Sequence, residues 1–359
     1  MNLLFDIGHP GQVHLFRNAI SILKSRGHDI TVTVKDLPAA RQLLDAYGIP
    51  WVSLGRKYDT LLLKGLSQAR YNYRLWRIAC EQKTDIAIGS SITVAHASFF
   101  HGMKSIILDD DDADAVRLFS LFAHPFADTV LSPAALASQR KHRRDVVYEG
   151  THELFYLHPS RFTPDPSVAR EAGIDLSRPF FIARFVSGKA YHDKGERWMT
   201  MDQKLGIIRL LERHGRVCIT TERAIEPELE KWQLKVAPEL IHHLLYYSTM
   251  FVGDSQTMTS EAAILGTPAL KCNSFAHKLS VPNMLEEKYD LCYAFQPEEY
   301  GMMVNKIGEL LSIADLKRIW QEKRERFLSG VIDPTAFLVR FIENYPTRKH
   351  RSPADNIPF

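Results

Sequence analysis

Short apolar runs alternate with longer amphipathic segments along most of the chain. Asn2 to Ile7 is an apolar run, and in His14 to Ser25 the apolar positions recur at helical spacing. Ile30 to Val34 and Ala39 to Tyr47 repeat the same order. Short apolar runs predict buried strands, and a helical period predicts amphipathic helices. Because strands that alternate with helices form a parallel sheet covered on both faces, the pattern predicts an α/β protein with Rossmann-like parallel sheets.

The alternation is interrupted by a proline-containing stretch from Glu149 to Pro166, after which strands and helices alternate again. A chain of 359 residues also exceeds the length at which one hydrophobic core usually stops growing. We therefore expect two domains, an acceptor-side domain over residues 1–158 and a nucleotide-side domain over 159–333. A C-terminal helix over 334–346 follows, with a return to the first domain left open, and the polar tail over 347–359 is expected to be loose.

Composition excludes several classes of protein. The formal net charge of +3 gives no strong field for drawing the chain onto nucleic acid, so no nucleic-acid partner is expected. The four cysteines have neither disulfide-framework nor zinc-site spacing, and the N-terminus has no signal-peptide pattern. These features favour a cytoplasmic protein without a structural metal.

In open α/β sheets, ligands bind beyond the carboxyl ends of the strands, where helix N-termini favour anions. The loop from Asp6 to His14 follows the first strand, and Gly11 within it permits close approach of a ligand to the backbone. His14 could accept a proton from a sugar hydroxyl. A purely structural tight turn, with His14 as a packing residue, is an equally open interpretation.

The segment from Gly253 to Ala263 runs from a strand end into a helix and is the most specific local signal. Ser255, Gln256 and Thr257 are expected at a bound diphosphate, together with the backbone N–H groups beside them. Glu261, one turn into the helix, could accept hydrogen bonds from both ribose hydroxyls. The alternative is an ordinary helix cap, in which threonine side chains bond the first turn.

A third loop, with Arg184 and Ser187, follows the first strand of the second domain and suits a phosphate-bearing ligand. A solvated loop is the alternative. Asp109 to Asp112 follows another strand, and such adjacent carboxylates need a cation, a basic partner or solvent. We expect an exposed acidic turn there, with Asp110 as a less favoured general base. Arg140 to Arg144 is a basic patch that could meet lipid headgroups, although a solvated helix end is the commoner interpretation.

Three motifs together resemble the family known as domain of unknown function 354. They are Asp6 to His14 with Arg26-Gly27-His28, Tyr148 to Pro159, and Gly253 to Pro268. That family is placed among glycosyltransferase-B-like proteins, related to UDP-N-acetylglucosamine 2-epimerase and to the N-acetylglucosaminyltransferase that makes lipid II. The resemblance implies two Rossmann-like domains that face a cleft.

The resemblance also implies roles for individual residues. Asp254 to Thr257 is similar to the epimerase segment Asp-Ser-Gly-Gly that contacts the nucleotide diphosphate, with Gln256 and Thr257 in place of the two glycines. Glu261 matches the glutamate that holds the ribose. His14 falls near the histidine of the Gly-Gly-His loop of the transferase.

These considerations favour a glycosyltransferase that moves a sugar from a nucleoside-diphosphate sugar to a glycan or lipid-linked acceptor in surface polysaccharide assembly. His14 is the expected base and Asp110 the second choice. No metal cofactor is required, since helix dipoles and cations can stabilise the departing diphosphate. Peripheral contact with the inner face of the membrane is left open. A UDP-sugar 2-epimerase or hydrolase, or a non-catalytic binding protein on the same fold, are the alternatives.

Overall fold

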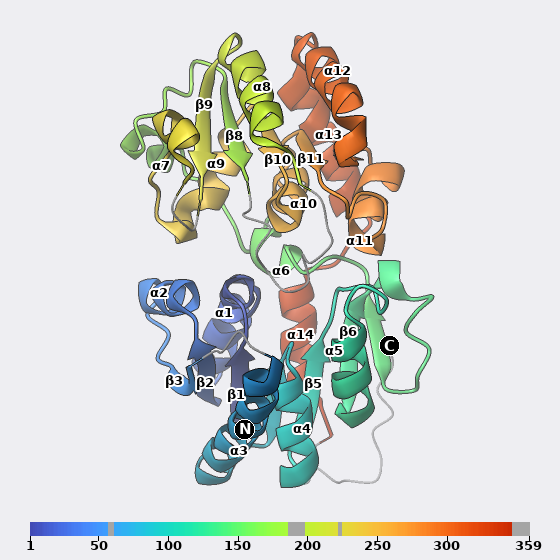
Figure 1. Ribbon diagram of the computed structural model, residues 1–359. Coiled ribbons are helices and arrows are strands. Elements are labelled where there is room, and N and C mark those ends of the chain that lie inside the picture. The colour runs from blue at the N-terminus through green and yellow to red at the C-terminus, as the bar shows by residue number, and fades with distance from the viewer. Residues whose placement is uncertain (57–60, 186–197, 222–224, 347–359) are drawn as a thin grey trace. The chain divides into compact units, whose positions relative to one another are not determined.

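The computed structural model describes residues 1–56, 61–185, 198–221 and 225–346, without the side chains of 56 and 61–66. The described chain forms two compact units (Figure 1). Unit 1 contains Met1–Tyr156 and the chain from Ile332 onward, and unit 2 contains Leu157–Val331. Each unit is an α/β layer structure built on a parallel sheet, as the alternating pattern predicts.

Unit 1 has a seven-stranded parallel sheet in the order β3-β2-β1-β4-β5-β6-β7. Its strands are β1 (Asn2–Ile7), β2 (Asp29–Asp36), β3 (Val52–Arg56), β4 (Ile86–Gly89), β5 (Lys104–Leu108), β6 (Thr129–Pro133) and β7 (Asp145–Tyr148). Its helices are α1 (Pro10–Ser25), α2 (Pro38–Ala46), α3 (Leu61–Glu81), α4 (Ile92–His101), α5 (Arg117–Ala123), η1 (His124–Phe126), η2 (Ala134–Leu136), α6 (Leu154–Leu157), at which the chain leaves unit 1, and α14 (Pro334–Glu343).

Unit 2 has a five-stranded parallel sheet in the order β12-β11-β10-β8-β9. Its strands are β8 (Phe180–Arg184), β9 (Arg216–Thr220), β10 (Met250–Gly253), β11 (Ala269–Cys272) and β12 (Cys292–Phe295). Its helices are α7 (Pro166–Glu171), α8 (Met201–Glu212), η4 (Pro227–Trp232), η5 (Pro238–Leu240), α9 (Ile241–Tyr247), α10 (Gln256–Ile264), α11 (Ser280–Asn283), η6 (Met284–Lys288), η7 (Pro297–Glu299), α12 (Tyr300–Leu311) and α13 (Leu316–Leu328).

The two edge strands of the unit 1 sheet, β3 and β7, are not indicated by the hydrophobic pattern. Both are short and only partly buried, with Val52 45% and Val147 40% exposed. An edge strand has a neighbouring strand on one side only, and part of its surface is exposed. It therefore needs no long apolar run, and the hydrophobic pattern indicates it only weakly. The central strands β1, β4 and β5 are almost fully buried and are predicted from their apolar residues.

The final helix, α14, belongs to unit 1, although it follows all of unit 2 in the sequence. The hydroxyl of Thr335 donates to the carbonyl of Phe155 over 2.8 Å, and Tyr345 and Thr129 share a buried hydrogen bond of 2.7 Å. On the surface, Glu343 pairs with Arg26, which directly follows α1. These contacts fix the end of the described chain to the first domain.

Strand order determines where each sheet can hold a ligand. In unit 1 the chain builds outward in one direction from β1 and in the other from β4. In unit 2 the same reversal falls between β8 and β10. Loops that leave neighbouring strands in opposite directions leave room at the carboxyl edge of the sheet, which is where open α/β sheets bind ligands. The carboxyl edge of each sheet is therefore the place to look for a site.

Candidate functional site

The carboxyl edge of the unit 2 sheet brings the end of β8 against the start of α10. Gly253, the last residue of β10, pairs with Arg184, the last residue of β8. A Cβ atom at position 253 would lie 2.1 Å from the carbonyl oxygen of Arg184, so only glycine fits. The N–H of Asp254 donates to that carbonyl over 3.1 Å. The predicted diphosphate loop and Arg184 are thus brought together within unit 2.

Helix α10 begins directly after this contact, and Ser255 is its N-cap. The Ser255 hydroxyl accepts from the N–H of Met258 over 3.4 Å, while Thr259 donates to the Ser255 carbonyl over 2.7 Å. The first N–H groups of a helix have no partner within it and carry partial positive charge, which favours an anion beside the exposed Thr257. The Ser255 hydroxyl caps the N–H of Met258, whereas an anion would bind other N–H groups of the first turn. The two interpretations of this segment are therefore compatible.

Gln256 is held by Lys271 of β11, whose ammonium group donates to the Gln256 side-chain oxygen. The Gln256 side-chain nitrogen is buried and has no hydrogen-bond partner in the described part of the chain. Burial lowers the pKa of Lys271 to about 8. The side chain of Gln256 thus presents an unused donor near the start of α10.

Glu261 lies in the second turn of α10 and is 5% exposed. One of its carboxylate oxygens lies 3.0 Å from Nε2 of His242, which comes from α9 and is itself 1% exposed. This pair ties α10 to α9 inside unit 2. The assignment of Glu261 to a ribose stays a prediction, and a nucleotide would have to share the carboxylate with His242.

In unit 1, the loop after β1 has a clear structural role. Asp6 is fully buried and accepts from Thr33 over 2.8 Å and from Ser91 over 2.6 Å, which joins the ends of β1, β2 and β4. His9 caps α1 by accepting from the N–H of Gly11 over 3.2 Å. Gly11 thus lies at the positive end of a 16-residue helix, where a ligand loop is predicted. The loop also serves as the structural start of this helix, with His9 as its N-cap.

His14 is 7% exposed and lies inside unit 1 between two tyrosine rings. The Tyr47 hydroxyl and Nδ1 of His14 are 3.1 Å apart, and the rings of His14 and Tyr156 are 5.4 Å apart. Both contacts are those of a packing histidine. A role for His14 as a base stays a prediction, and the structure offers a second candidate at the same edge.

The acidic turn after β5 is not an exposed turn throughout, and there the expectation from sequence is wrong. Asp109 is 3% exposed and accepts from Arg140 and from His124, each over 2.8 Å. Asp112 is 9% exposed and accepts from Gln139. Arg140 thus supplies the opposite charge for Asp109, and the Gln139 amide supplies a hydrogen bond to Asp112.

The same contact corrects the interpretation of the basic patch. Arg140 is 8% exposed and also donates to Ser132 over 2.9 Å, so it is part of the core and not a solvated helix end. The segment from 140 to 144 is not helical. Lys141, His142 and Arg143 are exposed, as the sequence predicts.

Asp110, beside the buried turn, faces a different set of partners. One of its oxygens lies 3.0 Å from Nδ1 of His152, which comes from the loop after β7. Glu153 and Tyr148 complete the group and are 7% and 3% exposed. Nε2 of His152, one oxygen of Glu153 and the hydroxyl of Tyr148 are buried and have no hydrogen-bond partner among the described residues. We call Asp110, Tyr148, His152 and Glu153 the acid–base cluster.

Charge and burial act in opposite directions within the acid–base cluster. Burial raises the pKa of Glu153 and the negative charge of Asp110 raises it further, to about 7. Burial raises the pKa of Asp110, but the charge and hydrogen bond of His152 outweigh this and lower it. Burial lowers the pKa of His152, but the Asp110 carboxylate outweighs this and raises it. The cluster thus combines an ion pair with a carboxyl group that is half-protonated near neutral pH, as proton transfer requires.

Sequence reasoning names Asp110 but not Tyr148, His152 or Glu153 as functional. All three lie in the segment Tyr148 to Pro159, which contributes to the family resemblance but which sequence reasoning treats largely as a domain connection. The only local signal was a histidine and a glutamate shortly after a glycine, because the strand that precedes them, β7, is not indicated by the hydrophobic pattern. The predicted site residue Ser187 lies outside the described residues. Within the described part of the chain, no group of three or more His, Cys, Asp or Glu side chains could hold a metal ion.

A family model described as protein of unknown function (DUF354) matches residues 1–319. The chain belongs to the DUF354 family. A relative of this DUF354 protein is the uncharacterized protein MJ0665 of Methanocaldococcus jannaschii, which is 22% identical over 332 residues, covering 88% of this chain and 95% of the relative.

Solved structures of sugar-nucleotide proteins share the fold of this DUF354 protein. MnaA of S. aureus, solved with UDP, superimposes with a TM-score of 0.68 and 13% identity over 96% of each chain. UDP-GlcNAc 2-epimerase of Neisseria meningitidis, bound to UDP-GlcNAc, gives 0.65 and 12% over 96% of this chain and 100% of its own. Alr3699/HepE of Anabaena, in complex with UDP and glucose, gives 0.64 and 14% over the same shares. The DUF354 chain therefore has the two-domain glycosyltransferase-B architecture that these structures share.

Proposed function

We propose that this DUF354 protein is a nucleotide-sugar enzyme, and that it transfers the sugar of a nucleoside-diphosphate sugar to a glycan or lipid-linked acceptor in surface polysaccharide assembly. The observation that carries the proposal is the acid–base cluster at the carboxyl edge of unit 1. The cluster places a buried carboxyl group with a pKa of about 7 next to a half-buried histidine–carboxylate pair.

Nucleotide binding is assigned to unit 2. Its support is the close contact of Gly253 with Arg184, which leaves a helix N-terminus and a guanidinium group at one sheet edge. Helix N-termini and arginine together suit a diphosphate. Similar structures that contain UDP have the same fold, which makes UDP the first nucleotide to test.

The acid–base cluster supplies the proton chemistry. Transfer to a hydroxyl needs a base that takes the acceptor proton, and a base works best when its pKa lies near the working pH. Glu153 meets this condition, so we assign it as the base in preference to His14. Asp110 is a positioning residue, because its charge raises the pKa of Glu153 and pairs with His152.

A second candidate function is 2-epimerisation or hydrolysis of a UDP-sugar. It is favoured by the presence of two different proton carriers in one cluster, since His152 has a raised pKa and can donate while Glu153 can accept. Reactions that remove and return a proton on the sugar itself need such a combination. The acceptor is then water or none.

Incubation of the purified protein with a panel of UDP-sugars, without and with extracts of lipid-linked acceptors, separates the two. If the protein is a transferase, the UDP-sugars stay intact without an acceptor, and UDP is released only when an acceptor is present. Epimer or free UDP without acceptor would identify the second function. If no common nucleotide raises the melting temperature at saturating concentration, the chain is a non-catalytic binding protein and the proposal fails.

Glu261→Ala tests the nucleotide assignment in the same screen. It is expected to reduce the UDP-induced rise in melting temperature, and an unchanged rise would remove Glu261 from the site. The reaction is also proposed to need no metal cofactor. Activity that survives dialysis against EDTA supports this, and activity restored only by added Mg²⁺ or Mn²⁺ contradicts it.

A further inference from the structure

Unit 1 also carries an exposed apolar surface that the proposed function does not use. It consists of six side chains from α4, α5 and η1, which we call the α4–α5 face: Phe99, Phe100, Leu118, Leu121, Phe122 and Phe126. Phe100 is 76% exposed and Phe99 63%. Isolated exposed apolar residues are normal, but a group of this size in one region marks an interaction surface.

Contacts connect the aromatic part of the α4–α5 face. The ring of Phe99 lies 5.5 Å from Phe100 and 5.5 Å from Phe126. His96 of α4 links the two helices, because its Nε2 lies 2.7 Å from the carbonyl oxygen of Phe122 and its ring 4.7 Å from that of Phe126. These contacts join α4 to α5 and η1 beneath the exposed rings.

Cations border the α4–α5 face. Arg144 lies directly beside it, because its guanidinium group donates to the carbonyls of His124, Pro125 and Ala127 over 2.7 to 3.2 Å. Lys141 and Arg143, in the turn before Arg144, are exposed.

Two acidic groups at the border are paired with cations. Asp128 pairs with Lys104 over 2.7 Å, and Asp114 pairs with Arg117 over 3.3 Å. Asp145, next to Arg144, accepts from the backbone N–H of His142 over 2.9 Å. The three cations Lys141, Arg143 and Arg144 outnumber this carboxylate, so the described border of the face carries net positive charge.

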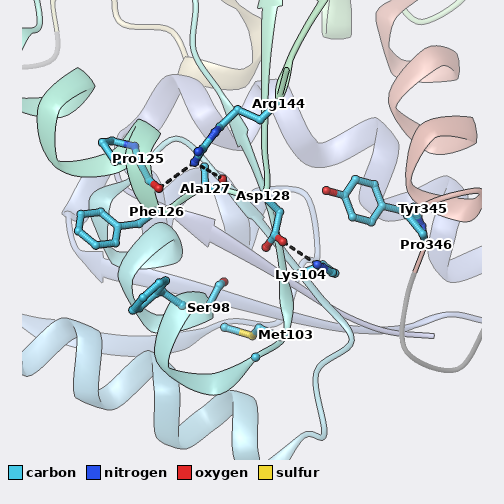
Figure 2. A pocket seen from close by; sticks show the side chains of 12 residues that line it. Ser98, Met103, Lys104, Pro125, Phe126, Ala127, Asp128, Arg144, Tyr345 and Pro346 are labelled. Carbon is cyan, nitrogen blue, oxygen red and sulfur yellow. Dashed lines mark hydrogen bonds and ion pairs between the residues drawn. The ribbon is translucent and has the colours of Figure 1, made fainter. Parts of the chain in front are cut away.

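A hollow of about 700 Å³ adjoins the face at the amino ends of β5 and β6. Phe99 and Phe126 reach it from the α4–α5 face, and Tyr345 lines its other side. Figure 2 shows Arg144 above Pro125 and Phe126, with the Lys104–Asp128 pair between them and Tyr345. The hollow lies at the opposite sheet edge from the acid–base cluster, so it is not part of that site.

We propose that the α4–α5 face is a docking surface for an anionic phospholipid bilayer. Aromatic and leucine side chains enter the boundary of the acyl chains, and Lys141, Arg143 and Arg144 meet the phosphate headgroups. A second copy of the chain fits less well, because a two-fold contact through this face would bring two borders of net positive charge together. The inference is independent of the proposed reaction.

Vesicle flotation of the full chain tests the inference. Vesicles of phosphatidylcholine alone are compared with vesicles that contain roughly one-third phosphatidylglycerol, which supplies the anionic charge. The wild type is expected to float with the anionic vesicles only. The double variant Phe99→Ser, Phe100→Ser is expected to lose at least about tenfold in partition coefficient, since it removes two apolar anchors.

Charge and control variants complete the experiment. Lys141→Glu with Arg143→Glu is expected to weaken binding to the anionic vesicles by about tenfold or more, since each cation contributes about 1 kcal/mol. Met302→Ser removes an equally exposed apolar side chain from unit 2, 61% exposed, and is expected to bind as the wild type. All three variants change exposed residues, so unchanged melting temperatures confirm that they fold.

Three results would overturn the proposal. One is absence of the wild type from the anionic vesicles, and another is equal flotation of the wild type and the Phe99→Ser, Phe100→Ser variant. The third comes from sedimentation velocity without vesicles. A dimer that dissociates in that same variant would identify a second copy of the chain as the occupant of the face.

Discussion

At the carboxyl edge of the unit 1 sheet the loops carry titratable side chains, whereas the same edge in unit 2 carries backbone groups and the start of a helix. In unit 1, Asp110, His152 and Glu153 are buried or half-buried beside one another. In unit 2, Gly253 and the Ser255 cap open α10 against the end of β8. The same sheet architecture thus carries titratable side chains at one carboxyl edge and a helix start at the other. Under the proposed function, the first edge moves a proton and the second holds an anion.

The two edges also differ in their effect on the stability of the folded protein. A carboxyl group buried with a raised pKa lowers stability at neutral pH, and proteins keep such groups where function needs them. Gly253 lowers the stability of the native state little, and its lack of a side chain lets the ends of β10 and β8 approach each other. The four predictions below test this contrast, from the largest expected effect to the smallest.

Glu153→Gln should abolish most of the activity and leave nucleotide binding intact. Loss of a general base typically costs about 10²- to 10⁴-fold in turnover. The measurement is the rate with the UDP-sugar found active in the panel, together with the affinity for UDP. Glu149→Gln, an exposed glutamate in the same segment, is the matched control and should keep full activity. A slow rate in both variants would show that the segment, not the Glu153 carboxyl group, is needed.

Arg140→Ala should destabilise unit 1 strongly, because it leaves the buried Asp109 carboxylate without its cation. Breaking a buried ion pair costs about 3–5 kcal/mol. Urea unfolding monitored by fluorescence measures the loss, with Arg143→Ala as the control because Arg143 is exposed. Equal stability of the two variants would mean that Arg140 is not part of the core.

The stability of the wild type should fall relative to Glu153→Gln as pH rises. The folded-state pKa of about 7 lies above the ordinary value of 4.5, so the folded state binds the proton more tightly than the unfolded chain. The penalty is absent below pH 4.5, grows between 4.5 and about 7, and is complete above that. A shift of this size corresponds to about 3 kcal/mol. Urea unfolding of both proteins at several pH values measures it, and parallel curves would contradict the raised pKa.

Gly253→Ala should destabilise unit 2 by about 1–3 kcal/mol, since the new methyl group would meet the Arg184 backbone. It should also weaken UDP binding, because the strand end must move. Gly308→Ala in α12 is the control, since a Cβ atom there meets nothing within 4 Å, and alanine favours the helix. Urea unfolding and UDP titration of both variants check this. A Gly253→Ala protein as stable as the wild type would refute the close contact.

The fold class follows from sequence because its signal is local. The buried strands β1, β4 and β5 are apolar runs, and amphipathic helices follow them, so each stretch identifies itself without knowledge of its neighbours. Edge strands such as β7 are not predicted from the apolar pattern, because they are only partly buried.

The acid–base cluster could not be derived in this way. Asp110 and His152 follow strands that are separated in the sheet by β6, so only the folded topology brings them together. The same holds for Arg140. Its charge predicts a surface residue, and only the folded structure shows that it pairs with the buried Asp109. Burial of a charged side chain depends on partners distant in sequence, which no local pattern encodes.

Isothermal titration of UDP into the wild type and Glu153→Gln tests the division between the two sheet edges most directly. The account predicts that UDP binds both proteins with the same affinity, because unit 2 holds the nucleotide and Glu153 acts only on the sugar or its acceptor. Absence of UDP binding to the wild type, or a marked loss of affinity in Glu153→Gln, would contradict it.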